Sequence, residues 1–146
     1  MPIADAMTVR VVSVRPDESV QVAIARMLEE NVGAVAVCEG DRLVGMFSER
    51  DVLRLAGDGT AFAELKVGDV MTRTLVTVTP DVDVAEAARL MRERKIRHLP
   101  VVQGENILGM VGIRDVMGAL VERLWRSHDE TAHDTARDLL SRGQTR

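Results

Sequence analysis

Aromatic residues are scarce in this sequence, at 2% of 146 residues, and their absence limits the chemistry that the protein can perform. Proteins that bind single-stranded nucleic acid stack the bases on aromatic side chains, and few are available here. The core has to be built from Val, Leu, Ile, Ala and Met instead. A hydrophobic content of 46% suffices for such a core and is typical of a globular protein.

Cysteine is almost absent as well. The single cysteine, Cys38, lies in the apolar run VGAVAVC. A disulfide within the chain is therefore excluded, which fits a reducing compartment. We expect Cys38 to be a packed thiol rather than a nucleophile, because a thiol in apolar surroundings ionises poorly.

Long apolar runs and a strong net charge are also missing. No segment approaches the roughly 18 apolar residues that span a bilayer, and the opening MPIADAM lacks the basic and apolar regions of a signal peptide. The net charge of -4 disfavours a general binder of nucleic acid or anionic membranes, since such binders rely on a basic field. We expect a cytoplasmic protein with neither partner.

Signatures of catalysis are not found. The glycines form neither the G-x-x-x-x-G-K-[ST] phosphate loop nor the G-x-G-x-x-G fingerprint. His128 and His133 are five residues apart in a polar tail, which is off the helical spacing of four for a pair of metal ligands. We predict no metal site and no enzymatic activity.

What the sequence does contain is an internal repeat with an offset of 64 residues. Residues 5–56 and 69–120 are identical at 18 of 52 positions without a gap, where chance would give about a tenth or less. The clearest match is GMFSERD (45–51), which returns as GMVGIRD with Gly112 in place of Ser48. The chain therefore contains two copies of one unit.

Each copy predicts the order β-α-β-β-α. Strands are expected at 11–14, 34–38 and 42–47 in the first copy and at 75–78, 99–102 and 106–111 in the second. Helices are expected after Pro16-Asp17 and Ser48 in the first copy and after Pro80-Asp81 and Gly112 in the second. A copy of this size could hardly bury an adequate core alone, so the two should pack face to face with pseudo-two-fold symmetry.

The repeat also predicts the domain limits. We place the first repeat at 3–57, a linker at 58–66 and the second repeat at 67–122. The remaining residues, 123–146, are expected to form a partly helical tail.

Ser48 and Asp51 suit a nucleotide. Ser48 lies where a strand is expected to end and a helix to begin, and free backbone N–H groups at such a point bind phosphate. The carboxylate of Asp51 can accept hydrogen bonds from the two adjacent hydroxyls of a ribose. The same pair could instead form a capping box that serves only the helix.

The tandem order, the phrase G-x-x-S-x-x-D in the first copy and KIRHLPVV (95–102) in the second resemble the cystathionine β-synthase (CBS) domain pair, or Bateman module, over about residues 3–122. This resemblance implies an α+β fold of two CBS repeats with a C-terminal helical tail. It implies a non-catalytic regulatory module without a catalytic cofactor, which binds an adenine nucleotide such as AMP, ATP or NAD. A homodimer and an unidentified regulated protein are the partners that it suggests.

In that family each cleft takes a ribose-binding aspartate from one copy and phosphate contacts from the other. By this resemblance, the first site is expected to contain Ser48, Arg50, Asp51, Arg97, His98, Val12, Ser13 and Pro100. A second, weaker site is expected to contain Gly112, Arg114, Asp115, Val76 and Thr77. The counterparts of Arg97 and His98 in the first copy are Gly33 and Ala34, which carry no charge. We therefore expect one competent cleft and one that is weaker, altered or empty.

Two alternatives stay open from the sequence. Arg97 and His98 could form an exposed corner between a helix and a strand. The whole chain could also be a ligand-free module for protein interaction or dimerisation.

Overall fold

The computed structural model describes residues 1–127, and residues 128–146, including His128 and His133, lie outside the described part. The first half contains η1 (Ile3–Asp5), β1 (Ser13–Val14), α1 (Val20–Glu30), β2 (Ala34–Glu39), β3 (Arg42–Ser48) and α2 (Glu49–Gly57). The second half contains α3 (Val67–Val70), α4 (Val84–Arg94), β4 (His98–Gln103), β5 (Asn106–Gly112) and α5 (Ile113–Ser127). The predicted mixed α+β fold is confirmed.

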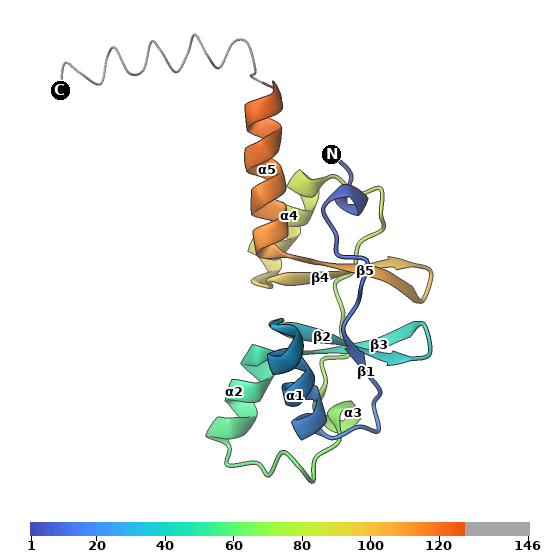
Figure 1. The fold of residues 1–146 in the computed structure, drawn as a ribbon, viewed down its shortest axis with the longest axis vertical. Helices are drawn as coiled ribbons and strands as arrows, with labels where there is room; N and C mark the ends of the chain where they lie inside the picture. Colours follow the sequence, from blue (N-terminus) through green and yellow to red (C-terminus); the bar gives the residue numbers. More distant parts are fainter. Residues whose placement is uncertain (128–146) are drawn as a thin grey trace, which may run out of the picture.

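The two halves stack with their hairpins facing each other and their helices outside (Figure 1). The strand order is β1-β2-β3-β5-β4, and β3 meets β5 only at the pair Arg42 and Asn106. The two hairpin turns are joined there, since the Leu43 N–H donates to the Glu105 carbonyl at 2.9 Å.

The hairpins β2–β3 and β4–β5 are alike in detail. Both are antiparallel, and each has a register shift at the equivalent point. Their turns place Gly40 and Gly104 at φ values of 62° and 63°, a left-handed conformation that glycine adopts without a steric cost. The 64-residue repeat of the sequence is therefore a repeat of backbone conformation.

Equivalent residues also begin and end the first helix of each half. The Ser19 hydroxyl caps α1, and the Asp83 carboxylate caps α4, each accepting from a first-turn N–H at 3.1 Å. Asn31 and Lys95 close the two helices, both at a φ of 54°. Asparagine tolerates this left-handed conformation better than lysine.

The strand predicted over 75–78 is wrong, because only a single bridge to β4 forms there. In the first half, the Ala36 N–H donates to the Val12 carbonyl at 3.0 Å and holds the chain beside β2. The counterpart of Ala36 is Pro100, which has no N–H to donate. One proline thus shortens the pairing in the second half.

The halves are interlocked by exchanged segments, which Figure 1 shows crossing from one half to the other. Before β1, Ile3 enters the core of the second half, and Thr8 exchanges backbone hydrogen bonds with Met110 at 2.8 and 3.0 Å. After α3, Thr72 exchanges the equivalent bonds with Met46 at 2.9 and 3.0 Å. Each half is completed by chain that precedes the other half's strands.

Two separate hydrophobic cores result. The core of the first half contains Val14, Val20, Ala23, Met27, Val35, Val37, Phe47, Leu55, Val67 and Met71. The core of the second half contains Ile3, Val78, Val84, Ala87, Met91, Leu99, Val101, Val111, Val116 and Ala119. Phe62 and Leu65, from the predicted linker, pack against the first core, so this segment is more than a connection.

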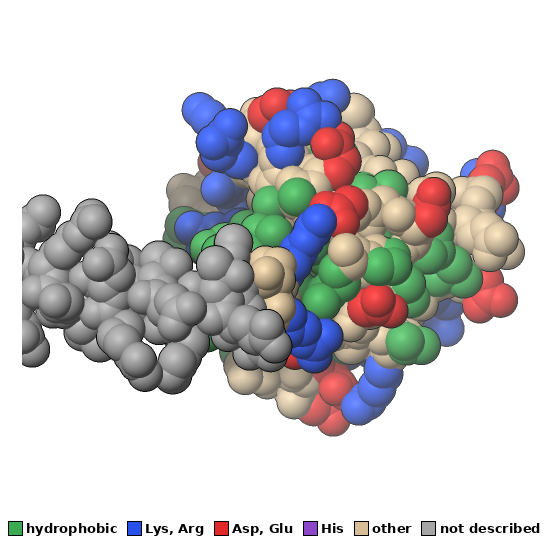
Figure 2. All heavy atoms as spheres, turned by 90° about the horizontal axis from the view of Figure 1, so that it is seen from above, with side chains coloured by type: hydrophobic (Ala, Val, Ile, Leu, Met, Phe, Trp, Pro, Cys, Tyr) green, Lys and Arg blue, Asp and Glu red, His purple; other side chains and the backbone are tan. Residues whose placement is uncertain are grey.

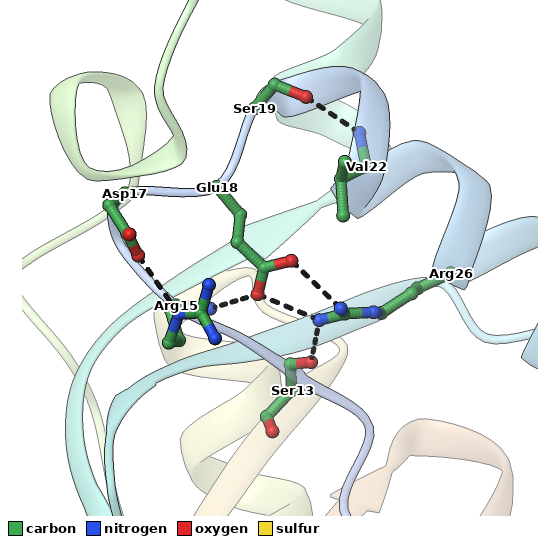
Figure 3. Close-up of polar contacts among 7 residues, drawn as sticks. All are labelled: Ser13, Arg15, Asp17, Glu18, Ser19, Val22 and Arg26. Atoms are coloured by element: carbon green, nitrogen blue, oxygen red, sulfur yellow. Dashed lines mark hydrogen bonds and ion pairs between the residues drawn. The ribbon is translucent and has the colours of Figure 1, made fainter.

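A polar cluster supports the start of α1 (Figure 3). The Glu18 carboxylate accepts two hydrogen bonds from the Arg26 guanidinium, at 3.0 and 2.8 Å, and one from the Arg15 N–H at 2.9 Å. Arg26 also donates to the Ser13 carbonyl at 2.8 Å. Burial alone would raise the pKa of Glu18, but these hydrogen bonds and the charge of Arg26 outweigh it and lower that pKa.

The outer face of α5 is partly apolar. Met117, Val121, Leu124 and Trp125 are between 51% and 68% exposed and follow helical spacing. In the view from this end, hydrophobic side chains lie on the surface among charged ones (Figure 2). Of the helices in residues 1–127, none has the length and apolar character that a membrane span requires.

Candidate functional site

Two clefts lie where the halves meet, and the 64-residue offset relates them. We call them the Asp51 cleft, with a cavity volume of about 530 Å³, and the Asp115 cleft, with about 480 Å³. Met46, Thr72, Val76, Ile96 and Pro100 are among the lining residues of the Asp51 cleft. Met110, Thr8, Val12 and Val32 occupy the equivalent positions of the Asp115 cleft.

Asp51 is fixed at the start of α2 and is only 6% exposed. Its Oδ2 accepts from the Ser48 N–H at 2.9 Å and from the Ser48 hydroxyl at 3.2 Å, while Oδ1 pairs with the Arg54 guanidinium at 3.2 Å. The capping alternative thus describes real contacts. A carboxylate has about four lone-pair sites, so these three contacts leave room for a ligand hydroxyl, and movement of the exposed Arg54 would free another.

Asp115 is held less firmly. Its carboxylate accepts from the Gly112 N–H at 3.1 Å, and glycine offers no hydroxyl to add a second bond. The counterpart of Arg54 is Gly118, so the ion pair is missing too. Asp115 is accordingly exposed, whereas Asp51 is buried.

Most of the residues predicted for the first site lie together. Ser48, Arg50, Asp51, Arg97, His98 and Pro100 all line the Asp51 cleft. The first three come from the first half and the others from the second, so both halves contribute to one cavity. Gly112, Arg114 and Asp115 line the second cleft, as the prediction placed them.

The predicted apolar segments were assigned to the wrong clefts. Val12 lines the Asp115 cleft, and Val76 lines the Asp51 cleft. The exchange of segments causes this, since the chain before Val76 runs along β3 at Thr72 before it enters the second half. Ser13 and Thr77 line neither cleft; both are exposed on the alternate face of their segments.

Arg97, His98 and Glu49 belong to both clefts, together with Gly33 and Ala34. The starts of the helices are tied to this region, since Glu49 N–H donates to the Gly33 carbonyl at 3.0 Å and Ile113 N–H to the Arg97 carbonyl at 2.8 Å. These two bonds are equivalent under the 64-residue offset. The pseudo-two-fold axis therefore passes through the wall that separates the clefts.

His98 is half-buried in this wall. Burial lowers the pKa of its imidazole, and the Arg97 charge lowers it further, while Glu49 and Asp115 oppose the shift. His98 is therefore mainly neutral near pH 7, and its charge is sensitive to any anion placed beside it.

The expectation of one competent cleft and one weaker cleft stays a prediction, and the cationic residues of the two clefts can be compared. The cationic residues that line the Asp51 cleft are Arg50, Arg54, Lys95 and Arg97, and those that line the Asp115 cleft are Arg10, Arg97 and Arg114. Glu49 offsets part of the positive charge in both. The second cleft lacks the serine hydroxyl and has three cationic lining residues where the first has four, one of which, Arg54, is paired with Asp51.

Sequence reasoning missed Arg10, Glu49 and Lys95. Arg10 enters its cleft through the exchanged N-terminal segment, and local sequence does not reveal that exchange. Lys95 lies within the phrase KIRHLPVV, but its part in the cleft depends on its position at the end of α4, which the sequence does not show. Glu49 could have been found, because it follows Ser48 at the helix start where a phosphate was expected.

No metal or nucleophile emerges in the described part of the chain. No group of three or more His, Cys, Asp or Glu side chains within residues 1–127 could hold a metal ion. Cys38 lies in β2 and is 5% exposed, and burial raises the pKa of its thiol. This fits the predicted packed thiol.

The model of the CBS domain family matches residues 3–58 and 67–122. A CBS domain-containing protein of Bacillus subtilis, YhcV, is 36% identical over 78% of this chain and 81% of its own length. The mitochondrial protein CBSX3 of Arabidopsis thaliana is 41% identical over 72% of this chain. The match spans 54% of CBSX3, so this chain corresponds to about half of that relative.

Two solved structures carry adenosine-containing ligands. The CBS domain protein PAE2072 from Pyrobaculum aerophilum, in complex with AMP, is 24% identical, with a TM-score of 0.74 over 79% of this chain and 89% of its own. The CBS domain pair of MJ0100, with 5-methylthioadenosine and S-adenosyl-L-methionine, is 19% identical, with a TM-score of 0.77 over 84% and 98%. At these identities the likeness establishes the fold alone.

Proposed function

The chain belongs to the CBS-domain family, with two such domains in tandem, and from this premise we propose that it is a non-catalytic regulatory module that binds an adenine nucleotide between its repeats. The observation that carries the proposal is the Asp51 cleft, where a carboxylate from the first half and an arginine from the second face one cavity. The ligands of PAE2072 and MJ0100 support an adenosine-containing molecule as the class.

Each part of a nucleotide has a complementary surface in this cleft. We assign the ribose hydroxyls to Asp51, whose carboxylate is oriented by its bonds to Ser48. The phosphate is assigned to Arg50, Lys95 and Arg97 with the N–H groups at the start of α2, since charge-assisted hydrogen bonds are the strong ones.

The base is assigned to the apolar lining of the same cleft. Val76, Ile96 and Pro100 provide that surface, and backbone groups nearby can fix the ring's orientation. Apolar contacts of this kind favour the transfer of a purine ring from water into the cleft, and no charged side chain is needed for them.

The signal would arise because the ligand touches both halves. A ligand shifts an equilibrium between conformations only by its difference in affinity for them. A nucleotide that contacts both Asp51 and Arg97 favours those arrangements of the two halves in which it can reach both residues at once. A change in their relative orientation, or in a homodimer built on them, would pass the signal to a regulated protein in the cytoplasm.

Isothermal titration calorimetry with AMP, ATP and NAD tests the proposal. We expect at least one of them to bind below millimolar concentration, and Asp51→Ala to weaken that binding at least tenfold, which is about 1.4 kcal/mol. Asp58→Ala is the matched control, because Asp58 is exposed at the other end of α2 and lines neither cleft. Absence of binding by all three nucleotides at millimolar concentration contradicts the proposal.

A second candidate is a ligand-free interaction module, favoured by the exposed apolar face of α5. Met117, Val121, Leu124 and Trp125 would then be covered by a second copy or another protein. Thermal melts separate the candidates, since a ligand at 100 times its dissociation constant adds about 2.7 kcal/mol of stability. A melting temperature that rises with nucleotide favours the sensor; one that rises only with protein concentration favours the interaction module.

A further inference from the structure

The two clefts share a wall whose charges come from unequal positions. Under the 64-residue offset, Gly33 corresponds to Arg97, and Ala34 corresponds to His98. Two perfect copies would give each cleft its own cationic pair, but here the pair in the second half faces both clefts. The clefts therefore have one Arg97 and one His98 between them.

The wall is thin because glycine stands on both sides of the imidazole. A Cβ atom added to Gly33 would lie 3.4 Å from His98 Cε1, and one added to Gly112 would lie 3.7 Å from His98 Cδ2. The ring thus lies between Gly33, just before β2, and Gly112, just before α5, where a larger residue would come into contact with it. A larger residue than glycine at position 33 would also press on the Glu49 carboxylate, at 3.1 Å.

Glu49 makes the sharing more consequential. Its counterpart is Ile113, so the wall carries one carboxylate as well as one guanidinium, and both clefts contain it. An anion that binds on one side engages Arg97 and neutralises the charge that offsets Glu49. A second anion, on the other side, then meets a less favourable field, because the Arg97 charge is already engaged and the Glu49 charge and the first anion both repel it.

We propose that Arg97 and His98 form one anion-binding element shared by the two clefts, so that an anionic nucleotide bound in either cleft weakens binding in the other. This inference rests on the proposed function, since it concerns how that function's ligand is divided between two sites. Arg50 and Lys95 act on the Asp51 cleft, and Arg10 and Arg114 act on the Asp115 cleft. Only the wall residues couple the two.

Calorimetry with AMP on variants that retain one cleft tests the coupling. Asp51→Ala leaves the Asp115 cleft, and Asp115→Ala leaves the Asp51 cleft. Whether the wild-type titration shows one binding step or two, the cleft that fills last should bind AMP at least tenfold more tightly in the variant that retains only that cleft. Equal affinities in the wild type and the single-cleft variants overturn the coupling, as does a second cleft that stays empty in its own variant.

The two proposals fail differently. If AMP binds the wild type but the clefts are independent, the coupling is wrong and the nucleotide-binding function stands. If neither AMP, ATP nor NAD binds the wild type or either variant at millimolar concentration, both are overturned. Circular dichroism of each variant establishes that a lost affinity is not a lost fold.

Substitution of two cationic side chains distinguishes a residue that acts on both clefts from one that acts on a single cleft. Arg97→Ala should weaken AMP binding at least threefold in both single-cleft backgrounds. Lys95→Ala is the matched control. Lys95 lies two residues before Arg97, and it lines the Asp51 cleft but not the Asp115 cleft. This control should weaken binding in the Asp115→Ala background and leave the Asp51→Ala background unchanged. An Arg97→Ala effect confined to one background overturns the proposal.

The pKa of His98 provides a further test, because it would not change on binding if the wall only separated the clefts. Its pKa responds to Glu49 on α2, Asp115 on α5 and the neighbouring Arg97. Bound AMP adds negative charge, so the pKa of His98, followed by the NMR signals of its ring, should rise in both single-cleft variants. A rise in only one variant contradicts a shared element.

Discussion

The two repeats differ little in backbone and much in charge. Both turn at an equivalent glycine, cap their helices at equivalent positions and receive a segment from the other repeat. Their clefts nevertheless differ at Ser48 and Gly112, and at Glu49 and Ile113. The comparison teaches that duplication has preserved the positions that shape the chain and the aspartate of each cleft, while the residues two and three positions before each aspartate and those of the shared wall have diverged.

The same contrast is found away from the clefts. Where the first repeat has Glu18 and Arg26 in a polar cluster, the second has Val82 and Leu90, which pack against its core. Both solutions hold the start of the first helix against the preceding segment. An ion pair and an apolar pair are thus alternatives at one structural position.

The largest effect is expected when the two cores are compared directly. Phe47 and Val111 are counterparts, and both are fully buried. Phe47→Ala should lower the free energy of unfolding by about 3–5 kcal/mol, because a ring leaves a larger cavity than the two methyl groups of valine. Val111→Ala should cost clearly less. Urea unfolding followed by circular dichroism measures both.

Leu28→Ala is the control for these core variants, since Leu28 is 77% exposed and should change stability by no more than about 0.5 kcal/mol. Because each core contains a segment from the other half, Phe47→Ala should also keep a single unfolding transition. Two separate transitions, or equal costs for Phe47→Ala and Val111→Ala, would contradict this view of the cores.

Much of the fold was predictable, because the repeat and the apolar periodicity are local signals. The mixed fold and the paired hairpins followed from the offset together with the apolar periodicity and turn residues of each copy. The strand at 75–78 did not form, because Pro100 has no N–H to donate to it. This could not be predicted, since it depends on which segment lies beside Pro100 in the folded chain.

The site was predictable only in part, for a related reason. Residues next to recognisable phrases, such as Asp51 and Arg97, were found, but Val12 and Val76 were placed in each other's clefts. The exchange of segments between halves is a long-range property that neither spacing nor composition contains. Arg10 was missed for the same reason, since it reaches the Asp115 cleft through the exchanged N-terminal segment.

A medium effect is expected when the polar cluster is converted into its apolar counterpart. Glu18→Val or Arg26→Leu alone should cost about 1–2 kcal/mol, since hydrogen bonds to charged groups contribute about 1.5–3 kcal/mol and the partial exposure of Arg26 screens part of this. The double variant copies Val82 and Leu90 and should recover most of the loss. Additive costs in urea unfolding would show that the pair is not coupled.

The pH dependence of this cluster has a definite sign. The pKa of Glu18 is lower in the folded protein than its ordinary value of 4.5. The unfolded chain therefore takes up the proton first, so the stabilisation is complete above about pH 4.5 and is lost as the pH falls through the folded pKa. Glu18→Gln should reduce stability at pH 7, and its difference from the wild type should shrink below pH 4.5. A difference that is constant from pH 7 to pH 3 would contradict this.

The smallest effect concerns the last residue of the two equivalent helices. Asn31 and Lys95 share a φ of 54°, and a left-handed conformation costs a side chain such as lysine more than asparagine. Lys95→Asn should therefore raise the free energy of unfolding by about 0.5 kcal/mol, while it weakens AMP binding in the Asp51 cleft, which loses a cation. Asn31→Lys is the reverse change and should lower stability by a similar amount. If Lys95→Asn destabilises the protein, the lysine is held by contacts that its conformation alone does not reveal, and the two helix ends are not equivalent.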